Sequence, residues 1–383
     1  MKIFIAAFNE ISERQCSKAK SGFLSRFKSV RHDDFVYENP DIIWFLTGGS
    51  EHNALKQIEA HNRYAFIASE NDNSWAAATE VKAYLNSKGI ITRVFNLDKL
   101  KSLESVYDFL NPQKDFDTVR LGLVGEPADW LVASIPDFDL LKEVLNIEVV
   151  KFAKTDLLGT ELVNKTKDFQ DTFAKVEFDY KSNIAELYDK ICSFASINNL
   201  DALSIDCFNF IKNSDYAPCC AFSVINDKHF PVVCEGDLCS AAGMIVCFRF
   251  SGLIPWMANL KYISKDFAGF SHCTVPLNMT EKFSIVSHFE SGKSASIKGE
   301  LKKELVTVFR IDRNLENCFL ALGEIYEDDN NEKSCRTQVK IKMSSKSLFL
   351  LREFPLGNHH LIIPGDYTDI LAEYFTNKGF RIV

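Results

Sequence analysis

An apolar strand segment that ends in two carboxylates constrains the fold of this chain more than any other feature. Residues 232–234 are apolar, Glu235 and Asp237 follow with one glycine between them, and a run of small residues typical of a helix starts at Leu238. A buried strand that passes directly into a helix is the building unit of a parallel sheet covered by helices. Ligands and catalytic groups gather at the carboxyl ends of such strands. The segment therefore predicts an α/β protein with a candidate site at Glu235 and Asp237.

The first 250 residues repeat this strand-and-helix pattern twice. Apolar strands are predicted at residues 2–8, 41–46, 64–68 and 91–95, with helices between them, and a polar, turn-like segment at 111–115 marks a boundary. The pattern then starts again, with strands predicted at 119–124, 148–151, 202–205, 221–224 and 232–234. We therefore expect two parallel-sheet domains, at residues 1–114 and 115–252.

The pattern changes after residue 252. Short strands without a strong helical run are predicted at residues 272–277, 283–287, 305–311, 319–324, 337–343 and 348–351, with polar turns between them. Regularly spaced strands of this kind indicate an antiparallel sheet that closes into a small barrel. Residues 253–383 are therefore predicted to form a β-barrel domain that ends in a helix at 366–378.

Charge and composition exclude several classes of protein. The formal net charge of −8 and the lack of a basic block argue against a nucleic-acid-binding protein. No apolar run approaches the ~18 residues that a membrane-spanning helix needs, so we expect no membrane insertion. The eleven cysteines are irregularly spaced and odd in number, and no signal peptide precedes them. This pattern predicts reduced thiols in a cytoplasmic protein.

Glu235 and Asp237 are the strongest candidates for chemistry. Their spacing of two would place both on one side of an extended segment, and their oxygens suit Mg²⁺ or Mn²⁺. Capping of the next helix would explain Asp237 without a ligand, but not Glu235. His359 and His360 would supply imidazole ligands. Because neighbours on a strand face opposite ways, at most one of these two histidines should enter a given site.

Weaker candidates lie at other strand ends. Gly49 and Ser50 follow the strand at 41–46, where free backbone amides would attract a ligand, although taken alone a tight turn with Ser50 as helix cap is the preferred explanation. Asn73 begins the next helix, and Trp130 lies in a loop of the second domain. His272 is a weaker histidine candidate. A nucleophilic pair of His272 and Cys273 is disfavoured because adjacent residues rarely face each other.

Taken together, these segments resemble the L-fucose/L-arabinose isomerase-like superfamily. The resemblance is carried, in order, by residues 47–51, 73–80, 125–130, 234–237, 271–274 and 357–360. It implies two Rossmann-like α/β domains followed by an antiparallel β-barrel. It also implies an aldose–ketose isomerase that uses Mn²⁺ and an ene-diol intermediate, acts on a small sugar, and assembles into a trimer or hexamer.

The resemblance also assigns roles to particular residues. Asp237 corresponds to the metal-binding acid before the small-residue helix, and His359 or His360 to the imidazole ligand near the C-terminus. The second acidic ligand of the family is a glutamate about two dozen residues upstream; no glutamate occurs there, and Asp206 or Glu235 is the candidate substitute. The predicted sugar-binding residues are Gly49, Ser50, Asn73, Trp130, Asp206 and His272.

Two other functions stay open on this sequence. The missing upstream glutamate favours a sugar-binding or regulatory relative that has lost the chemistry. An acid–base enzyme that works without a metal ion is the third option, with Glu235 and Asp237 moving the proton.

Overall fold

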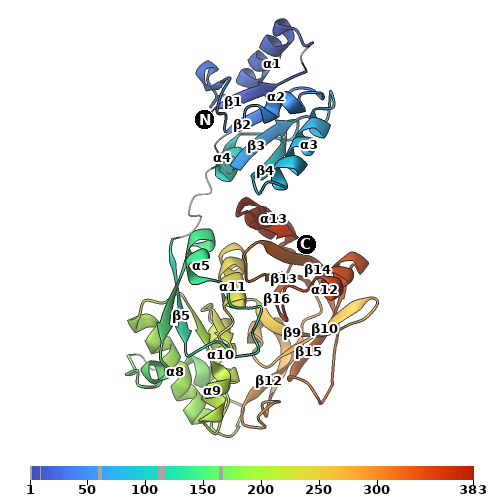
Figure 1. Cartoon of the computed structure of the whole chain (residues 1–383). Helices are drawn as coiled ribbons and strands as arrows, with labels where there is room; N and C mark the ends of the chain where they lie inside the picture. The colour runs from blue at the N-terminus through green and yellow to red at the C-terminus, as the bar shows by residue number, and fades with distance from the viewer. Residues whose placement is uncertain (1, 9, 59–62, 111–116, 164–166) are drawn as a thin grey trace. The chain divides into compact units, whose positions relative to one another are not determined.

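The chain folds into two compact units, residues 1–115 and 116–383 (Figure 1). The structure is a computed structural model that describes residues 2–8, 10–58, 63–110, 117–163 and 167–383. The predicted boundary at 114/115 lies outside the described residues, and the predicted division at 252/253 falls inside the second unit and stays a prediction. Among the described helices, none is long and apolar enough to cross a membrane.

The first unit is a parallel sheet with helices on both faces. Side chains alternate along each strand, so that Trp44 packs with Phe23 on one face while Phe45 joins Ala77 on the other. The four strands are hydrogen-bonded in the order β1 (Ile3–Ala6), β2 (Ile42–Phe45), β3 (Arg63–Ala68) and β4 (Ile91–Asn96). The helices are α1 (Glu13–Arg26), α2 (Glu51–Leu55), α3 (Ser74–Asn86) and α4 (Glu104–Leu110).

The second unit begins with another four-stranded parallel sheet. Its strands are hydrogen-bonded in the order β6 (Ile147–Phe152), β5 (Val119–Val124), β7 (Ala202–Ile205) and β8 (Val232–Cys234). Its helices are α5 (Phe138–Leu145), α6 (Lys154–Leu158), α7 (Asp168–Thr172), α8 (Lys181–Ile197), α9 (Cys207–Lys212), α10 (Cys219–Asp227) and α11 (Leu238–Ser251). The strands β7 and β8 are buried along their whole length, as expected for a sheet covered on both faces.

An antiparallel barrel completes the second unit. Six strands close on themselves, because β13 pairs with both β16 and β14, and a short parallel strand, β17 (Arg381–Ile382), joins β14. The barrel order is β13 (Leu305–Ile311), β16 (His359–Pro364), β9 (Trp256–Ile263), β10 (Phe267–His272), β15 (Thr337–Met343) and β14 (Asn317–Asp328). A separate hairpin, β11 (Thr280–Val286) and β12 (Ser296–Leu301), and helices α12 (Ser345–Glu353) and α13 (Thr368–Asn377) flank it. The predicted fold class, two parallel α/β sheets followed by an antiparallel barrel, is confirmed.

Helix α11 joins the parallel sheet to the barrel. It contacts β7 and β8 on the sheet side and β13 and β16 on the barrel side, and its residues 238–247 are all buried. Gly243 lies so close to the barrel that an added Cβ would stand 2.8 Å from Leu361 and 3.0 Å from Phe309. One continuous hydrophobic core therefore runs from the sheet through α11 into the barrel.

Three predicted strands are wrong. Of residues 272–277, only His272 lies in a strand, at the end of β10, and a 3₁₀ helix begins at Leu277. Residues 221–224 lie in helix α10, and residues 348–351 lie in helix α12. A short apolar run that is buried does not reveal its own period, so a buried helix and a buried strand look alike there. At α12 the missed signal is Ser344, whose hydroxyl accepts from the Ser347 backbone N–H and starts the helix.

The close packing of α11 makes a testable prediction. Replacing Gly243 with leucine should destabilise the second unit by about 1–3 kcal/mol, because the extra atoms have no space beside Phe309. Differential scanning calorimetry measures this. Gly22, in α1 of the first unit, has open space around its added Cβ, so Gly22→Ala should leave that transition unchanged. An unaltered unfolding transition for Gly243→Leu would contradict the packing described for α11.

Candidate metal centre

Three side chains from distant parts of the second unit converge on one point. Glu235 follows β8, His272 ends β10 and His359 begins β16. The Nε2 atoms of both histidines lie 3.7 Å from Glu235 Oε1, and the three ligand atoms lie within 4.8 Å of one another. Donor atoms bound to one ion at about 2.0–2.2 Å are separated by roughly 3–3.5 Å. The three atoms are therefore slightly farther apart than they would be around a metal ion.

Barrel pairing explains why two histidines so far apart in sequence meet. His359 is paired with Asn259 on β9, and Asn259 is paired with Ser271 on β10, next to His272. The two imidazole ring centres consequently lie 5.7 Å apart. The barrel thus brings the two rings together from β10 and β16, the two strands that flank β9.

The backbone at Glu235 is strained. Glu235 has φ = 67° and Gly236 has φ = 73°, so the chain is not extended here, contrary to the expectation that Glu235 and Asp237 share one side of a straight segment. A Cβ on Gly236 would stand 2.6 Å from the Pro127 backbone, which leaves room only for glycine. A left-handed glutamate costs free energy that the surrounding structure must supply, and such residues concentrate at functional sites.

Asp237 fixes the orientation of the His359 ring through a hydrogen bond to Nδ1. Its Oδ2 accepts from His359 Nδ1 at 2.8 Å, and its Oδ1 accepts from the backbone N–H of Ser240 at 2.7 Å, which caps α11. The side chain has no exposed surface. Asp237 was predicted as a metal ligand, but it contacts the far side of the His359 ring and is not one of the three converging residues. Its hydrogen bond places a proton on Nδ1 and fixes the ring so that Nε2 is the nitrogen that faces Glu235.

Arg310 fixes the start of β16. Its guanidinium donates to the His359 carbonyl, to the Ser134 hydroxyl at 2.8 Å and to the Ala133 carbonyl at 3.2 Å. Gly357 permits this approach, since a Cβ there would overlap the guanidinium. Arg310 is almost fully buried and its positive charge acts on Asp237. It was missed in the sequence, where the only signal is one charged residue in the apolar strand at 305–311.

The other two converging residues are oriented as well. Trp130 Nε1 donates to Glu235 Oε2 at 2.7 Å, and the indole packs edge-on against Phe208. His272 Nδ1 is hydrogen-bonded to the Thr274 hydroxyl at 2.9 Å. One heteroatom of each residue is thus held by a neighbour and the other faces the centre. This is the arrangement typical of metal ligands in proteins.

Neighbouring groups of opposite charge shift the pKa values of the ionisable residues in the centre. Burial raises the pKa of Glu235, but its close contact with His272 and the charges of His359 and His272 outweigh burial and lower it below the usual range. Burial lowers the pKa of His272, whereas Glu235 raises it, to a net value of about 9. The pKa of Asp237 is lowered because His359 and Arg310 outweigh its burial. Both carboxylates are therefore ionised at neutral pH and can neutralise a cation.

His360 faces the opposite way from His359. Its ring lies edge-on to Phe270 and Phe319, and its Nδ1 is hydrogen-bonded to the Asn358 carbonyl. Burial and the charge of Arg310 lower its pKa to about 3, so the ring stays neutral. Neighbouring side chains on a strand face opposite ways, so only one histidine of the pair faces Glu235. That histidine is His359.

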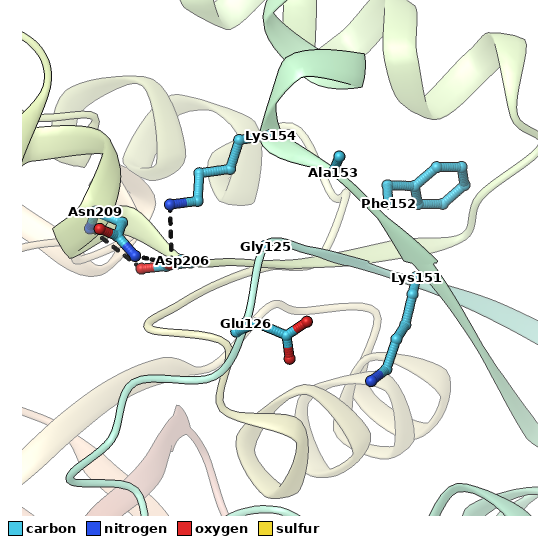
Figure 2. A pocket seen from close by; sticks show the side chains of 8 residues that line it. All are labelled: Gly125, Glu126, Lys151, Phe152, Ala153, Lys154, Asp206 and Asn209. Carbon is cyan, nitrogen blue, oxygen red and sulfur yellow. Dashed lines mark hydrogen bonds and ion pairs between the residues drawn. The ribbon is translucent and has the colours of Figure 1, made fainter.

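Asp206 lies in a separate pocket near the loop that carries Trp130. Asp206 Oδ2 pairs with Lys154 Nζ at 3.2 Å and accepts from Asn209 Nδ2 at 2.8 Å (Figure 2). The pocket has a volume of about 420 Å³, and its lining includes Glu126 and Lys151. Residues 125 and 126 line this pocket, while Trp130 of the same loop reaches Glu235. One loop thus contributes residues to the pocket and also contacts the converging atoms.

The candidates of the first unit lie on two neighbouring loops. The Gly48 N–H donates to the Asp72 carbonyl, which brings the turn after β2 against the start of α3. The buried Ser50 hydroxyl donates to the Thr47 carbonyl rather than capping α2. Asn73 has φ = 54° and its side chain does not cap α3. These contacts, with Gly49 at φ = 72°, describe a tight double turn.

The comparisons with known proteins add no assignment. No protein-family model matches the chain, and a search of curated proteins finds no matching relative.

Arg310 provides a test of this geometry. Arg310→Met should destabilise the second unit by about 3–5 kcal/mol, because it leaves the buried Asp237 carboxylate without its nearby cation. The exposed Arg313, which donates to the Val132 carbonyl, is the matched control, and Arg313→Met should cost less than ~1 kcal/mol. Urea unfolding followed by circular dichroism measures both. Equal effects of the two substitutions would contradict the role given to Arg310.

Proposed function

We propose that Glu235, His272 and His359 bind a divalent metal ion and that the protein is a metal-assisted aldose–ketose isomerase. The observation that carries the proposal is the convergence of two imidazole Nε2 atoms and one carboxylate oxygen. Two histidines and one carboxylate with open coordination positions form a common site for catalytic divalent ions. The resemblance to the L-fucose/L-arabinose isomerase-like superfamily supplies the reaction.

The donor atoms fit a metal of intermediate hardness. Imidazole with carboxylate suits Mn²⁺, Fe²⁺, Co²⁺ and Zn²⁺, and the resemblance favours Mn²⁺ among them. A bound ion of this class would polarise the carbonyl and the neighbouring hydroxyl of a sugar. The two ionised carboxylates, Glu235 and Asp237, would balance its charge.

The residues of the centre have separate roles in positioning the ligands and in proton transfer. Asp237 keeps the Nδ1 proton of His359 in place, and because it contacts the far side of the ring rather than the converging atoms, it serves as a positioning residue. Glu235 is the carboxylate whose Oε1 faces the imidazoles, so we assign the proton transfer between the two sugar carbons to it as well. Trp130 holds its second oxygen in place.

The neighbouring pocket suits a small polar ligand. Carboxylate, amide and ammonium groups line it, from Glu126, Asp206, Asn209, Lys151 and Lys154. Such groups form hydrogen bonds to sugar hydroxyls. We also propose a cytoplasmic location, based on the irregular cysteines, and a homotrimer or homohexamer, based on the resemblance.

A non-catalytic sugar-binding protein is the second candidate. Glu235, His272 and His359 are all buried, with at most 6% of each residue exposed, whereas the pocket at Asp206 is lined by other residues. That separation favours binding without turnover.

Metal binding is the first prediction from this proposal. Isothermal titration calorimetry with Mn²⁺ should show one site in the wild-type protein. Glu235→Gln and His359→Ala should abolish it, and Asp237→Asn should weaken it ~10- to 100-fold by freeing the His359 ring. The matched control is His360→Leu, which changes the neighbouring ring that faces away and should bind as the wild type does.

Two results would contradict the site. One is the absence of binding heat with Mn²⁺, Co²⁺ and Zn²⁺. The other is equal loss of binding in His359→Ala and His360→Leu, because the structure directs only His359 at Glu235.

Turnover is the second prediction and separates the two candidate functions. A panel of pentoses, deoxyhexoses and acidic sugars, tested with added Mn²⁺ by a ketose assay, should include a substrate whose conversion stops on adding a chelator. Thermal stabilisation by a sugar without conversion would favour the binding protein. Conversion that persists in chelator would instead support a metal-free acid–base enzyme.

A further inference from the structure

A second group of thiol and carboxylate side chains lies where β10 ends, beginning at the residue after His272. Cys273 directly follows β10, Glu290 lies in the turn between β11 and β12, and Cys335 lies between β14 and β15. The two sulfurs and a Glu290 oxygen lie within 4.8 Å of one another. The Cys335 thiol donates to Glu290 Oε1 at 3.3 Å. Three chain segments thus bring two thiols and a carboxylate together.

Two further residues support this group. Cys219, at the start of α10, contributes a third thiol that packs in one buried cluster with Cys273 and Cys335. His288 Nε2 lies 3.3 Å from Glu290 Oε2, and its Nδ1 is hydrogen-bonded to the Ser291 hydroxyl. One oxygen of the Glu290 carboxylate therefore contacts a histidine, and the other accepts a hydrogen bond from a thiol.

Burial distinguishes this group from ordinary core cysteines. Cys219, Cys273 and Cys335 are buried in a small apolar cluster with Ile211 and Ala217, which alone would describe inert packing. Glu290, in contrast, is exposed, yet directs its carboxylate at the Cys335 thiol. The exposed carboxylate lies between solvent and the buried thiols. An ion could therefore reach the thiols past Glu290, and Glu290 would supply an oxygen ligand.

We propose that Cys273, Cys335 and Glu290 bind a thiophilic divalent cation, most simply Zn²⁺, with Cys219 of the same buried cluster as the fourth donor. Zinc is bound tetrahedrally by thiolates at about 2.3 Å and by carboxylates at about 2.0–2.2 Å, which places neighbouring sulfurs roughly 3.8 Å apart. Each thiol releases its proton to solvent when the ion binds. The site is chemically distinct from the centre at Glu235, whose donors are nitrogen and oxygen.

An ion at this position would also fix one ligand of the first centre. It would link the end of β10 to the β11–β12 turn and the β14–β15 loop. Because His272 directly precedes Cys273, the position of its ring depends on that end of β10. The second site would thus act as a structural clamp beside the first.

Cobalt spectroscopy tests the proposal on the full-length, metal-free, reduced protein. Thiolate ligands give Co²⁺ an intense near-ultraviolet charge-transfer absorption, which nitrogen and oxygen ligands do not. We expect this absorption on titration with Co²⁺ and its loss on adding Zn²⁺. Cys273→Ser and Cys335→Ser should abolish it, and Glu290→Gln, at an exposed position that should not disturb folding, should weaken cobalt affinity at least ~10-fold.

Two controls keep this test independent of the proposed function. The double variant Glu235→Gln/His359→Ala should keep the charge-transfer absorption, and Cys247→Ala, at a buried thiol of α11, should keep it too. A wild-type protein without the absorption would overturn the proposal, as would an absorption that survives in Cys273→Ser and Cys335→Ser. Neither result bears on Mn²⁺ binding at Glu235.

Discussion

The hydrogen bond between Asp237 and His359 is the interaction on which the second unit depends most. It joins residues 122 positions apart and connects the first turn of α11 to the first residue of β16. Both groups are buried, so the carboxylate is tolerable only while His359 and Arg310 stand beside it. The same packing of α11 between sheet and barrel that forms the core therefore also sets the geometry of the candidate centre.

The side chains of this centre are oriented as expected for a ligand-binding site. The outer atoms of Glu235, His272 and His359 are each held by a hydrogen bond, and the inner atoms face one another. The left-handed conformation of Glu235 adds a local cost that a purely structural turn would avoid by using glycine or asparagine. Orientation, strain and charge balance together support a metal-assisted function more strongly than any of them alone.

The sequence predicted the layers of the fold better than it predicted the site. Strand and helix periods predicted both sheets and the barrel, and failed at 221–224, 272–277 and 348–351, where short buried runs carry no readable period. Glu235, Asp237 and His359 were predicted because they follow or begin apolar strands. Which carboxylate faces the imidazole, and the importance of His272, depend on a left-handed turn and on barrel register. Neither is visible without tertiary structure.

Pulsed electron paramagnetic resonance of the Mn²⁺-loaded protein tests the central claim most directly, because it detects ligand nitrogens whether or not the protein is active. The account predicts nitrogen couplings from two imidazoles, those of His272 and His359, with one coupling lost in His272→Ala and both kept in His360→Leu. A spectrum of Mn²⁺ surrounded by water alone, or one in which His360→Leu removes a coupling, would contradict it.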